Sequence, residues 1–327
     1  MLARVGGQIL TLAVSIALSL AFTWADQPSI PRIGVLAVGT IVLREDYLRD
    51  ALRDLGYIEG KNILIEWRRV LGTSADTSEE LSSLVGDLAQ SKVDLIVVFS
   101  TPAARAVLQT TKIPVVFVAG DPVGSGLAAS LARPGGQATG VSMLQPETAS
   151  KRIELLRQVA PGIHRIVFLM NSSNPLNAQV LEEVQRTART LNVKLATLDV
   201  TSTNELDGAL QSMPRGATNG LLVSPDLLFL ANRGKIARAV RKAKLPAIYP
   251  YKEYHDAGTL MSYGANIKEA NRKAASYVDK ILRGAKPSEL PIEQMSHYDL
   301  IIDLRVARAM GIHVPRDFIL RADEVIQ

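Results

Sequence analysis

The chain contains no cysteine among its 327 residues. This absence excludes disulfide bonds, thiolate metal sites, cysteine nucleophiles and a lipid-modified N-terminal cysteine. The absence of cysteine is also consistent with a protein that functions in an oxidising compartment. Aromatic residues are scarce at 5%, whereas 47% of the residues are hydrophobic. Because Val, Ile, Leu and Ala supply most of that fraction, the composition is typical of parallel sheets covered by helices.

Sequence motifs for catalysis, metal binding and nucleotide binding are missing as well. There is no G-x-S-x-G elbow and no Walker motif, and Gly124-Ser125-Gly126 fails the spacing of a dinucleotide-binding loop. The four histidines lie far apart without metal-ligand spacing: His164, His255, His297 and His313. The net charge of +5 is modest and no dense basic stripe is present, so we expect no nucleic-acid partner. We therefore expect no catalytic residues, no metal and no cofactor.

The N-terminal segment 1–25 holds the only long apolar run, ILTLAVSIALSLAFTWA. Arg4 is the only charge before Asp26, and the small residues Thr23 and Ala25 precede a plausible cut after Ala25. This order is typical of a secretory signal peptide, and the run is short of the ~20 apolar residues of a membrane span. We predict a cleaved signal and a periplasmic mature protein, with a retained anchor as the alternative.

Short apolar runs alternate with helical patterns along the rest of the chain. The predicted strands are 32–38, 62–69, 93–100, 114–120, 138–143, 165–171, 194–200, 220–226, 246–251, 259–264 and 297–303. The predicted helices are 43–56, 78–91, 102–111, 124–132, 147–159, 175–191, 203–213, 230–243, 267–283 and 304–310, followed by an irregular tail. This alternation predicts an α/β protein with two Rossmann-like parallel-sheet halves. Short joins near 140–150 and 259–266 indicate a hinge whose cleft can close on a ligand.

Small, polar or aromatic residues follow most of these strands, where open parallel sheets bind ligands. The candidate ligand-binding residues are Gly39, Thr40, Ser100, Thr101, Asp121, Asn171, Asn174, Ser224, Asp226, Tyr249 and Tyr251. Prolines that begin several of the following helices leave N-terminal N–H groups suited to an anion such as a carboxylate. Each position also has an ordinary interpretation, because Ser, Thr and Asn cap helices and tyrosines pack in cores.

The segment IPVVFVAGDPVGSG, residues 113–126, places Asp121 directly behind a buried strand. Its carboxylate is suited to accept from N–H groups near Val123–Ser125 as a cap. If it faces the cleft, it is suited instead to pair with a ligand ammonium. The sequence leaves both roles open.

Several long segments resemble one known family. They are LRDLGYIEGKNILIEWR (52–68), DPVGSGLAASLARPGGQATGVS (121–142), KRIELLRQVAPGIHRIVFLMNSSNP (151–175), GTLMSYGANIKEANRKAASYVDKILRGAKPSELPIEQ (258–294) and DLRVARAMGIHVPRDFILRADEVI (303–326). In their order they resemble the substrate-binding proteins of ABC importers, related to tryptophan- and tyrosine-binding lipoproteins. Unlike those lipoproteins, this chain has no cysteine at the signal junction.

The resemblance implies a type I periplasmic-binding-protein fold with a three-crossing hinge. It implies a first lobe of 30–144 plus 265–290 and a second lobe of 145–264 plus 291–327. By analogy, the Ser100–Thr101 loop takes a ligand α-carboxylate, and Asp121 or Asp226 takes the ammonium.

The implied function is a monomeric solute-binding component of an ABC importer. It would capture an amino acid, an aromatic one in some relatives, or a related carboxylate, and deliver it to the permease membrane subunits. A ligand sensor feeding a membrane receptor, and an enzyme on the same scaffold, remain as alternatives.

Overall fold

The computed structural model of the protein describes residues 30–38, 45–70 and 77–327. The predicted signal peptide and the candidates Gly39 and Thr40 lie outside these residues. The fold described below is that of the compact unit Arg32–Gln327. None of the described helices combines the length and the apolar character needed to cross a membrane.

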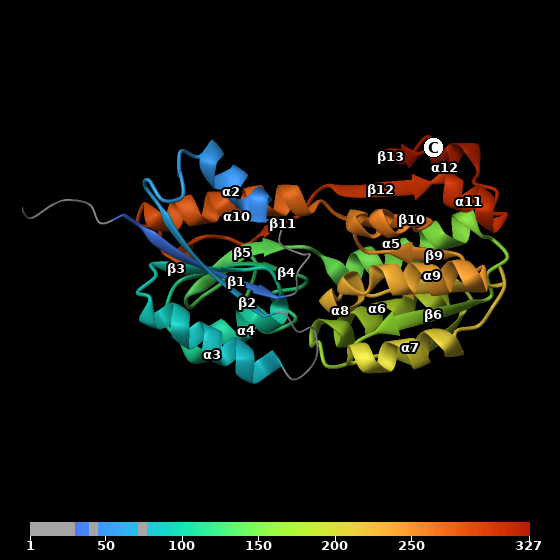
Figure 1. Cartoon of the computed structure of the whole chain (residues 1–327), viewed down its shortest axis with the longest axis horizontal. Coiled ribbons are helices and arrows are strands. Elements are labelled where there is room, and N and C mark those ends of the chain that lie inside the picture. The colour runs from blue at the N-terminus through green and yellow to red at the C-terminus, as the bar shows by residue number, and fades with distance from the viewer. Residues whose placement is uncertain (1–29, 39–44, 71–76) are drawn as a thin grey trace, which may run out of the picture. The chain divides into compact units, whose positions relative to one another are not determined.

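The first sheet is six-stranded, with the order β11-β5-β4-β3-β1-β2 and parallel pairing throughout. Its strands are β1 (Arg32–Val38), β2 (Leu64–Val70), β3 (Leu95–Val98), β4 (Val115–Ala119), β5 (Ala138–Ser142) and β11 (Glu293–Gln294). Its helices are α2 (Glu45–Asp54), α3 (Thr77–Gln90), α4 (Thr101–Thr110) and α10 (Ile267–Leu282). Helices α2 and α10 cover one face, and α3 and α4 cover the other (Figure 1). We call this assembly the first lobe.

The second sheet is seven-stranded, with the order β13-β12-β10-β9-β8-β6-β7. Its strands are β6 (Arg165–Met170), β7 (Lys194–Asp199), β8 (Asn219–Val223), β9 (Ala247–Tyr249), β10 (Met261–Ala265), β12 (Tyr298–Asp303) and β13 (Glu324–Ile326). Its helices are α5 (Gln145–Val159), α6 (Leu176–Thr190), α7 (Thr203–Ser212), α8 (Leu227–Ala231), α9 (Arg233–Ala243), α11 (Leu304–Met310) and α12 (Arg316–Ile319). Two 3₁₀ turns complete the chain, η1 (Lys252–Ala257) here and η2 (Pro287–Glu289) before β11. We call this assembly the second lobe.

The continuous apolar strands bury both of their faces. In β6, Ile166 and Phe168 pack with α5 and α6, while Val167 and Leu169 pack with residues of α7, α8 and α9. This follows from the period of two in a strand, which sends successive side chains to opposite faces. A strand covered by helices on both sides therefore reads as an uninterrupted apolar run.

The predicted α/β class with two Rossmann-like lobes is confirmed. The chain passes between the sheets three times, from β5 to α5, from β10 to α10 and from β11 to β12. These passages are only a few residues long, as a hinge requires. The first keeps close to β4, because the N–H groups of Met143 and Gln145 donate to Ala119 and Gly120.

The predicted helix 124–132 is wrong. The segment forms successive turns instead, in which the N–H groups of Ser125 and Leu127 donate to the carbonyls of Asp121 and Pro122. Gly126 has a φ of +73°, the left-handed region that favours glycine and interrupts a right-handed helix. A pattern of apolar residues at helical spacing was outweighed by the turn chemistry of Gly and Asp.

The C-terminal part also differs from expectation. Strand β11 pairs with β5, so the chain still belongs to the first sheet beyond residue 291, where we expected the second lobe to resume. Strand β12 runs antiparallel to β10, and the expected irregular tail contains α12 and the edge strand β13. The predicted helix 230–243 begins earlier, and it is divided at Asn232 into α8 and α9.

Candidate functional site

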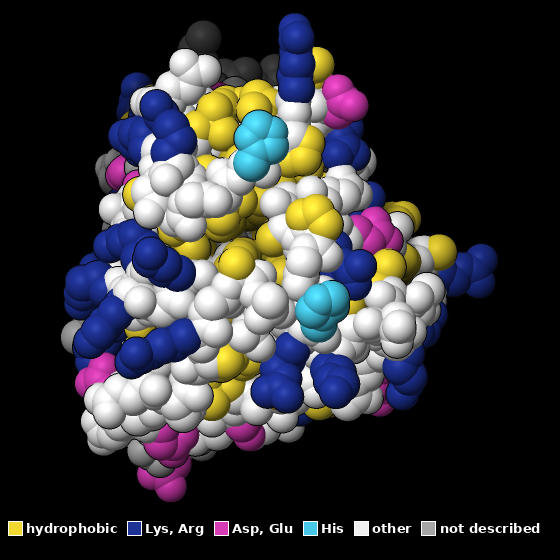
Figure 2. All heavy atoms as spheres, turned by 90° about the vertical axis from the view of Figure 1, so that its right-hand side faces the viewer, with side chains coloured by type: hydrophobic (Ala, Val, Ile, Leu, Met, Phe, Trp, Pro, Cys, Tyr) yellow, Lys and Arg dark blue, Asp and Glu magenta, His cyan; other side chains and the backbone are white. Residues whose placement is uncertain are grey.

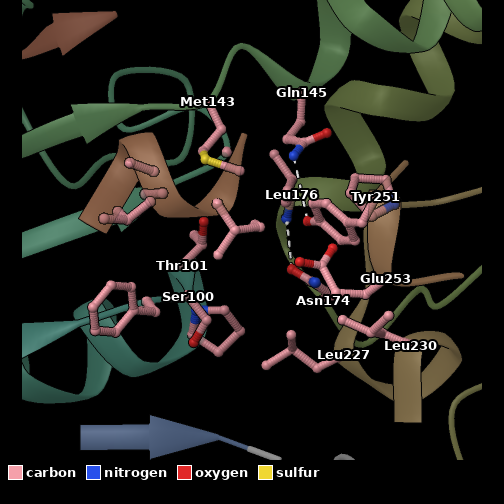
Figure 3. A pocket seen from close by; sticks show the side chains of 18 of the residues that line it. Ser100, Thr101, Met143, Gln145, Asn174, Leu176, Leu227, Leu230, Tyr251 and Glu253 are labelled. Carbon is pink, nitrogen blue, oxygen red and sulfur yellow. Dashed lines mark hydrogen bonds between the residues drawn. The ribbon is translucent and has the colours of Figure 1, made fainter. Parts of the chain in front are cut away.

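A cavity lies between the two lobes, with about 730 Å³ of empty space that is partly open to solvent. Its walls come from the ends of β3, β4 and β9, from the first turns of α4, α6 and α8, and from α10. Figure 3 shows Ser100 and Thr101 on one side and Tyr251, Glu253 and Leu230 on the other.

The first-lobe wall presents the N-terminus of α4. Ser100 is the N-cap, and its Oγ accepts from the Ala103 N–H at 3.2 Å. The neighbouring Thr101 is 3% exposed, and its Oγ1 has no hydrogen-bond partner. Asn271 of α10 lines the same wall, and its Oδ1 is also buried without a partner. Thr101 therefore offers a donor, beside a helix N-terminus that favours negative charge.

The second-lobe wall combines polar and apolar side chains. Gln145 Nε2 donates to Tyr251 Oη at 3.3 Å, so the amide and the ring close one corner of the cavity (Figure 3). Glu253, two residues further along, also lines the cavity. Leu176 and Leu227 add apolar surface to the cavity wall.

Charge is sparse in this cavity. Glu253 is the only charged side chain among its described lining residues. The other polar side chains that line it are neutral: Ser100, Thr101, Gln145, Asn174, Tyr251 and Asn271. The cavity therefore provides one anionic group, several hydrogen-bonding groups and a largely apolar wall. In the described part of the chain, no cluster of His, Cys, Asp or Glu is arranged to hold a metal ion.

Four of the sequence-predicted residues line this cavity: Ser100, Thr101, Asn174 and Tyr251. Among the described predicted residues, five do not line it: Asp121, Asn171, Ser224, Asp226 and Tyr249. Ser224 and Tyr249 are fully buried, and the Tyr249 ring packs on Tyr254 with ring centroids 4.7 Å apart. Their side chains belong to the interior of the second lobe.

Asp226 is held by its own lobe. Its Oδ2 accepts from the Nδ2 atoms of Asn174, Asn171 and Asn177 at 2.8, 3.3 and 3.4 Å. Its Oδ1 caps α8 by accepting from the Leu228 N–H at 2.9 Å. Burial raises the pKa of this carboxyl, and these four donors partly offset that effect. Asp226 thus ties the start of α6 to the start of α8 and fixes Asn174 at the cavity.

Asp121 closes a turn. Its Oδ1 accepts from the Gly124 N–H at 2.9 Å, and its carbonyl accepts from Ser125. The carboxylate therefore accepts a hydrogen bond from its own turn, and no helix follows it.

Comparison with known proteins places this arrangement in a family. Residues 40–326 match the family model described as ABC transporter substrate binding protein. The chain belongs to this family. The other sequence and fold comparisons agree with that membership.

One relative of this substrate-binding protein is a "Tyrosine-binding protein" from Clostridioides difficile. It is 27% identical over 264 residues, which cover 80% of this chain and 74% of the relative. A solved structure from Streptococcus pneumonia, an ABC domain in complex with L-Trp, is 25% identical and superposes with a TM-score of 0.83. That match covers 91% of this chain and all of the other.

A second solved structure is a substrate-binding protein with adhesive properties from Clostridium difficile, in its ligand-free, open form. It is 24% identical, with a TM-score of 0.66 over 91% of this chain and 99% of the other. These likenesses, with those to an ABC sugar transporter subunit from Rhodobacter sphaeroides and a LacI family transcriptional regulator from Bifidobacterium animalis, establish the type I periplasmic-binding-protein fold.

Several residues that line this candidate site were missed by the sequence survey. Gln145 stands at the predicted crossing, and Glu253 is two residues beyond Tyr251, so a wider window around each strand end would have found both. Asn271 lies inside a helix and carries no such signal. In the sequence, the apolar lining residues, such as Leu176 and Leu230, cannot be distinguished from residues of the hydrophobic core.

Gly120 is a point of close approach between the lobes of this substrate-binding protein. A Cβ added there would lie 2.4 Å from Cδ2 and 2.8 Å from Cδ1 of Leu176, which lines the cavity from the second lobe. Gly120→Ala should displace Leu176, hinder closure and weaken ligand binding about tenfold by calorimetry, since overpacking costs about 1–3 kcal/mol. Gly162→Ala, where an added Cβ meets nothing within 4 Å, is the matched control. Unchanged affinity in Gly120→Ala would contradict this role.

Proposed function

We propose that this substrate-binding protein captures a free amino acid with a large apolar side chain. The carrying observation is a single carboxylate, Glu253, in an otherwise neutral and largely apolar cavity. An ammonium group is the natural partner of that carboxylate. The two relatives with a tyrosine-binding name and an L-Trp complex support the same ligand class.

The opposite wall suits the ligand carboxylate. Thr101 Oγ1 is buried and has its proton available, and it stands at the first turn of the ten-residue helix α4. A hydroxyl donor beside a helix N-terminus stabilises an anion without a full positive charge. In this proposal, the ligand ammonium faces Glu253 on the second lobe and its carboxylate faces Thr101 on the first.

The ligand side chain would lie among apolar residues of both lobes. The apolar lining residues are Phe99, Val118, Met143, Leu176, Leu227, Leu230 and Ile267. Tyr251 adds a ring whose hydroxyl is already engaged by Gln145. Burial of apolar ligand surface against this lining would supply most of the affinity. An aromatic amino acid fits this lining, and so does a large aliphatic one.

Closure of the cleft follows from this ligand geometry. A ligand held by Glu253 and Thr101 contacts both lobes at once, so it stabilises the closed arrangement over the open one. We propose that the closed, ligand-loaded monomer acts in the periplasm and delivers the amino acid to an ABC permease. It would do so without chemical change to the ligand.

A thermal-shift screen tests the ligand class. Amino acids with large apolar side chains should raise the melting temperature, because a ligand at ~100 times its Kd adds about 2.7 kcal/mol to stability. L-Phenylalanine carries both the amine and the carboxylate. Phenethylamine lacks the carboxylate, and 3-phenylpropionate lacks the amine, so the three compounds form a matched set. The proposal expects the two truncated compounds to be inert at concentrations where the intact amino acid acts. A response to 3-phenylpropionate equal to that of the amino acid would overturn the assignment to Glu253.

A further inference from the structure

Arg152 is among the largest fully buried side chains in the described part of the chain, with 0% of its surface exposed. It lies on α5, seven residues after Gln145, and shares the buried face of that helix with Thr148 and Ala149. Helix α5 packs on β9 and β10, so the guanidinium lies inside the second lobe. It does not line the ligand cavity.

The guanidinium of Arg152 has no partner in the structure. All three of its nitrogens, Nε, Nη1 and Nη2, are buried without a hydrogen bond. Other Lys and Arg side chains of the second lobe are hydrated, because Figure 2 shows them spread over the surface. Buried charges in proteins are paired, because an isolated one costs far more than folding can offset.

Three tyrosines act electrostatically on Arg152. Tyr251, Tyr254 and Tyr263 are close enough for their charge state to act on it, and the Tyr254 hydroxyl is itself buried without a partner. Burial lowers the pKa of Arg152 to about 10, so the side chain is cationic at neutral pH. Burial also raises the pKa of Tyr251 and of Tyr254, so their hydroxyls keep their protons. The surroundings of Arg152 therefore combine a buried cation with neutral tyrosine hydroxyls.

No described carboxylate completes this group. Asp226, the buried acid of the same region, has its oxygens engaged by three asparagine side chains and the Leu228 N–H. Glu253 lines the ligand cavity, to which Arg152 is not exposed. A neutral water would satisfy N–H groups but would leave the charge uncompensated, whereas a small anion does both.

We propose that Arg152 and Tyr254 hold a buried monovalent anion of the halide class, behind Tyr251. Its charge balances the guanidinium, and the Tyr254 hydroxyl donates to it. Because Tyr254 follows Glu253 in η1, the anion fastens the segment that carries Tyr251 and Glu253 against α5. The anion is thus a structural component of the second lobe, and its presence does not depend on which solute the cleft binds.

Halide dependence of stability tests the proposal without any solute. The melting temperature of the mature chain would be measured in sodium chloride, sodium bromide and sodium gluconate at equal ionic strength. Wild type should melt about 2 °C or more higher in either halide than in gluconate. Arg152→Met, a neutral side chain of similar length, should lose this difference, and Arg321→Met on the surface should keep it. A difference that persists in Arg152→Met would overturn the proposal.

Bromide diffraction provides the second measurement, and it stands even if Arg152→Met does not fold. Crystals of the wild type grown in bromide should show an anomalous peak within hydrogen-bond distance of the Arg152 guanidinium and of Tyr254 Oη. Tyr254→Phe should reduce the occupancy of that peak. Bromide peaks confined to the surface, with water at the guanidinium and equal melting temperatures in halide and gluconate, would refute the site.

Discussion

Replacing Glu253 by glutamine should weaken binding of the amino acid ligand about 30-fold or more. Removing one partner of a desolvated, hydrogen-bonded charge pair costs about 2–5 kcal/mol, much of it from the charge left unpaired. Here the stranded charge would be the ligand ammonium, because Glu253 is the only charged side chain among the described cavity-lining residues. Isothermal titration calorimetry with the best amino acid of the thermal-shift screen measures the change.

Two controls make that result specific to the cavity. Glu154→Gln removes the same charge from a half-exposed surface pair with Lys151, and such pairs contribute little. Asp121→Asn alters the carboxylate that we first considered for the ammonium, and this side chain is occupied by the Gly124 N–H. Both variants should bind within about twofold of wild type, since neither contact is in the cavity. If Asp121→Asn weakened ligand binding as much as Glu253→Gln, the ligand ammonium would be assigned to Asp121 on the first lobe.

Replacing Gly264 by alanine should destabilise the fold by about 3 kcal/mol or more, at the upper end of overpacking effects. A Cβ at this position in β10 would lie 1.8 Å from the carbonyl oxygen of Pro250 and 2.9 Å from its carbon. Both atoms are backbone, so the neighbour cannot rotate aside as a side chain end would. The expected result is a lower urea midpoint followed by circular dichroism, or loss of soluble protein.

Gly86→Ala is the matched control for that experiment. Gly86 lies inside α3, its φ is not positive, and an added Cβ meets nothing within 4 Å. Alanine has the higher helix propensity, so this variant should gain up to about 1 kcal/mol. Opposite signs for the same chemical change would show that the space around each glycine decides the outcome. A Gly264→Ala protein as stable as wild type would mean that β10 and Pro250 do not approach so closely.

Most of the fold could be predicted because its strands are buried on both faces. The runs LIVVF (95–99) and IVFLM (166–170) are continuous and apolar, and each is followed by a helix that covers the sheet. The failure at β11 has a different cause from the failure at 124–132, because short-range patterns do not report long-range pairing. Strand β11 is only two residues long and owes its place to β5, some 150 residues earlier. Nothing within its own sequence distinguishes it from a loop.

The cavity was predicted in part for a similar reason. The ends of parallel strands converge, so the survey found Ser100, Thr101, Asn174 and Tyr251. The same rule cannot tell a side chain that faces the cleft from one that faces the lobe interior. Asp226 illustrates this limit, because its three asparagine partners come from a segment some fifty residues earlier. Only the folded arrangement shows that its carboxylate is already satisfied.

Helix α10 has a consequence for the order in which the chain acquires structure. It covers the face of the first sheet that carries Val35 and Val116, and Asp279 on it accepts from Tyr57 Oη, 222 positions earlier. Until residue 282 has been synthesised, α2 is the only described helix of the first lobe that covers this face, although every strand but β11 is already present. The core of the first lobe is therefore completed only by a segment that follows most of the second lobe in the chain. Loop closure over such a distance is slow, and a ribosome-bound chain that stops before α10 should expose this sheet to chaperones and proteases.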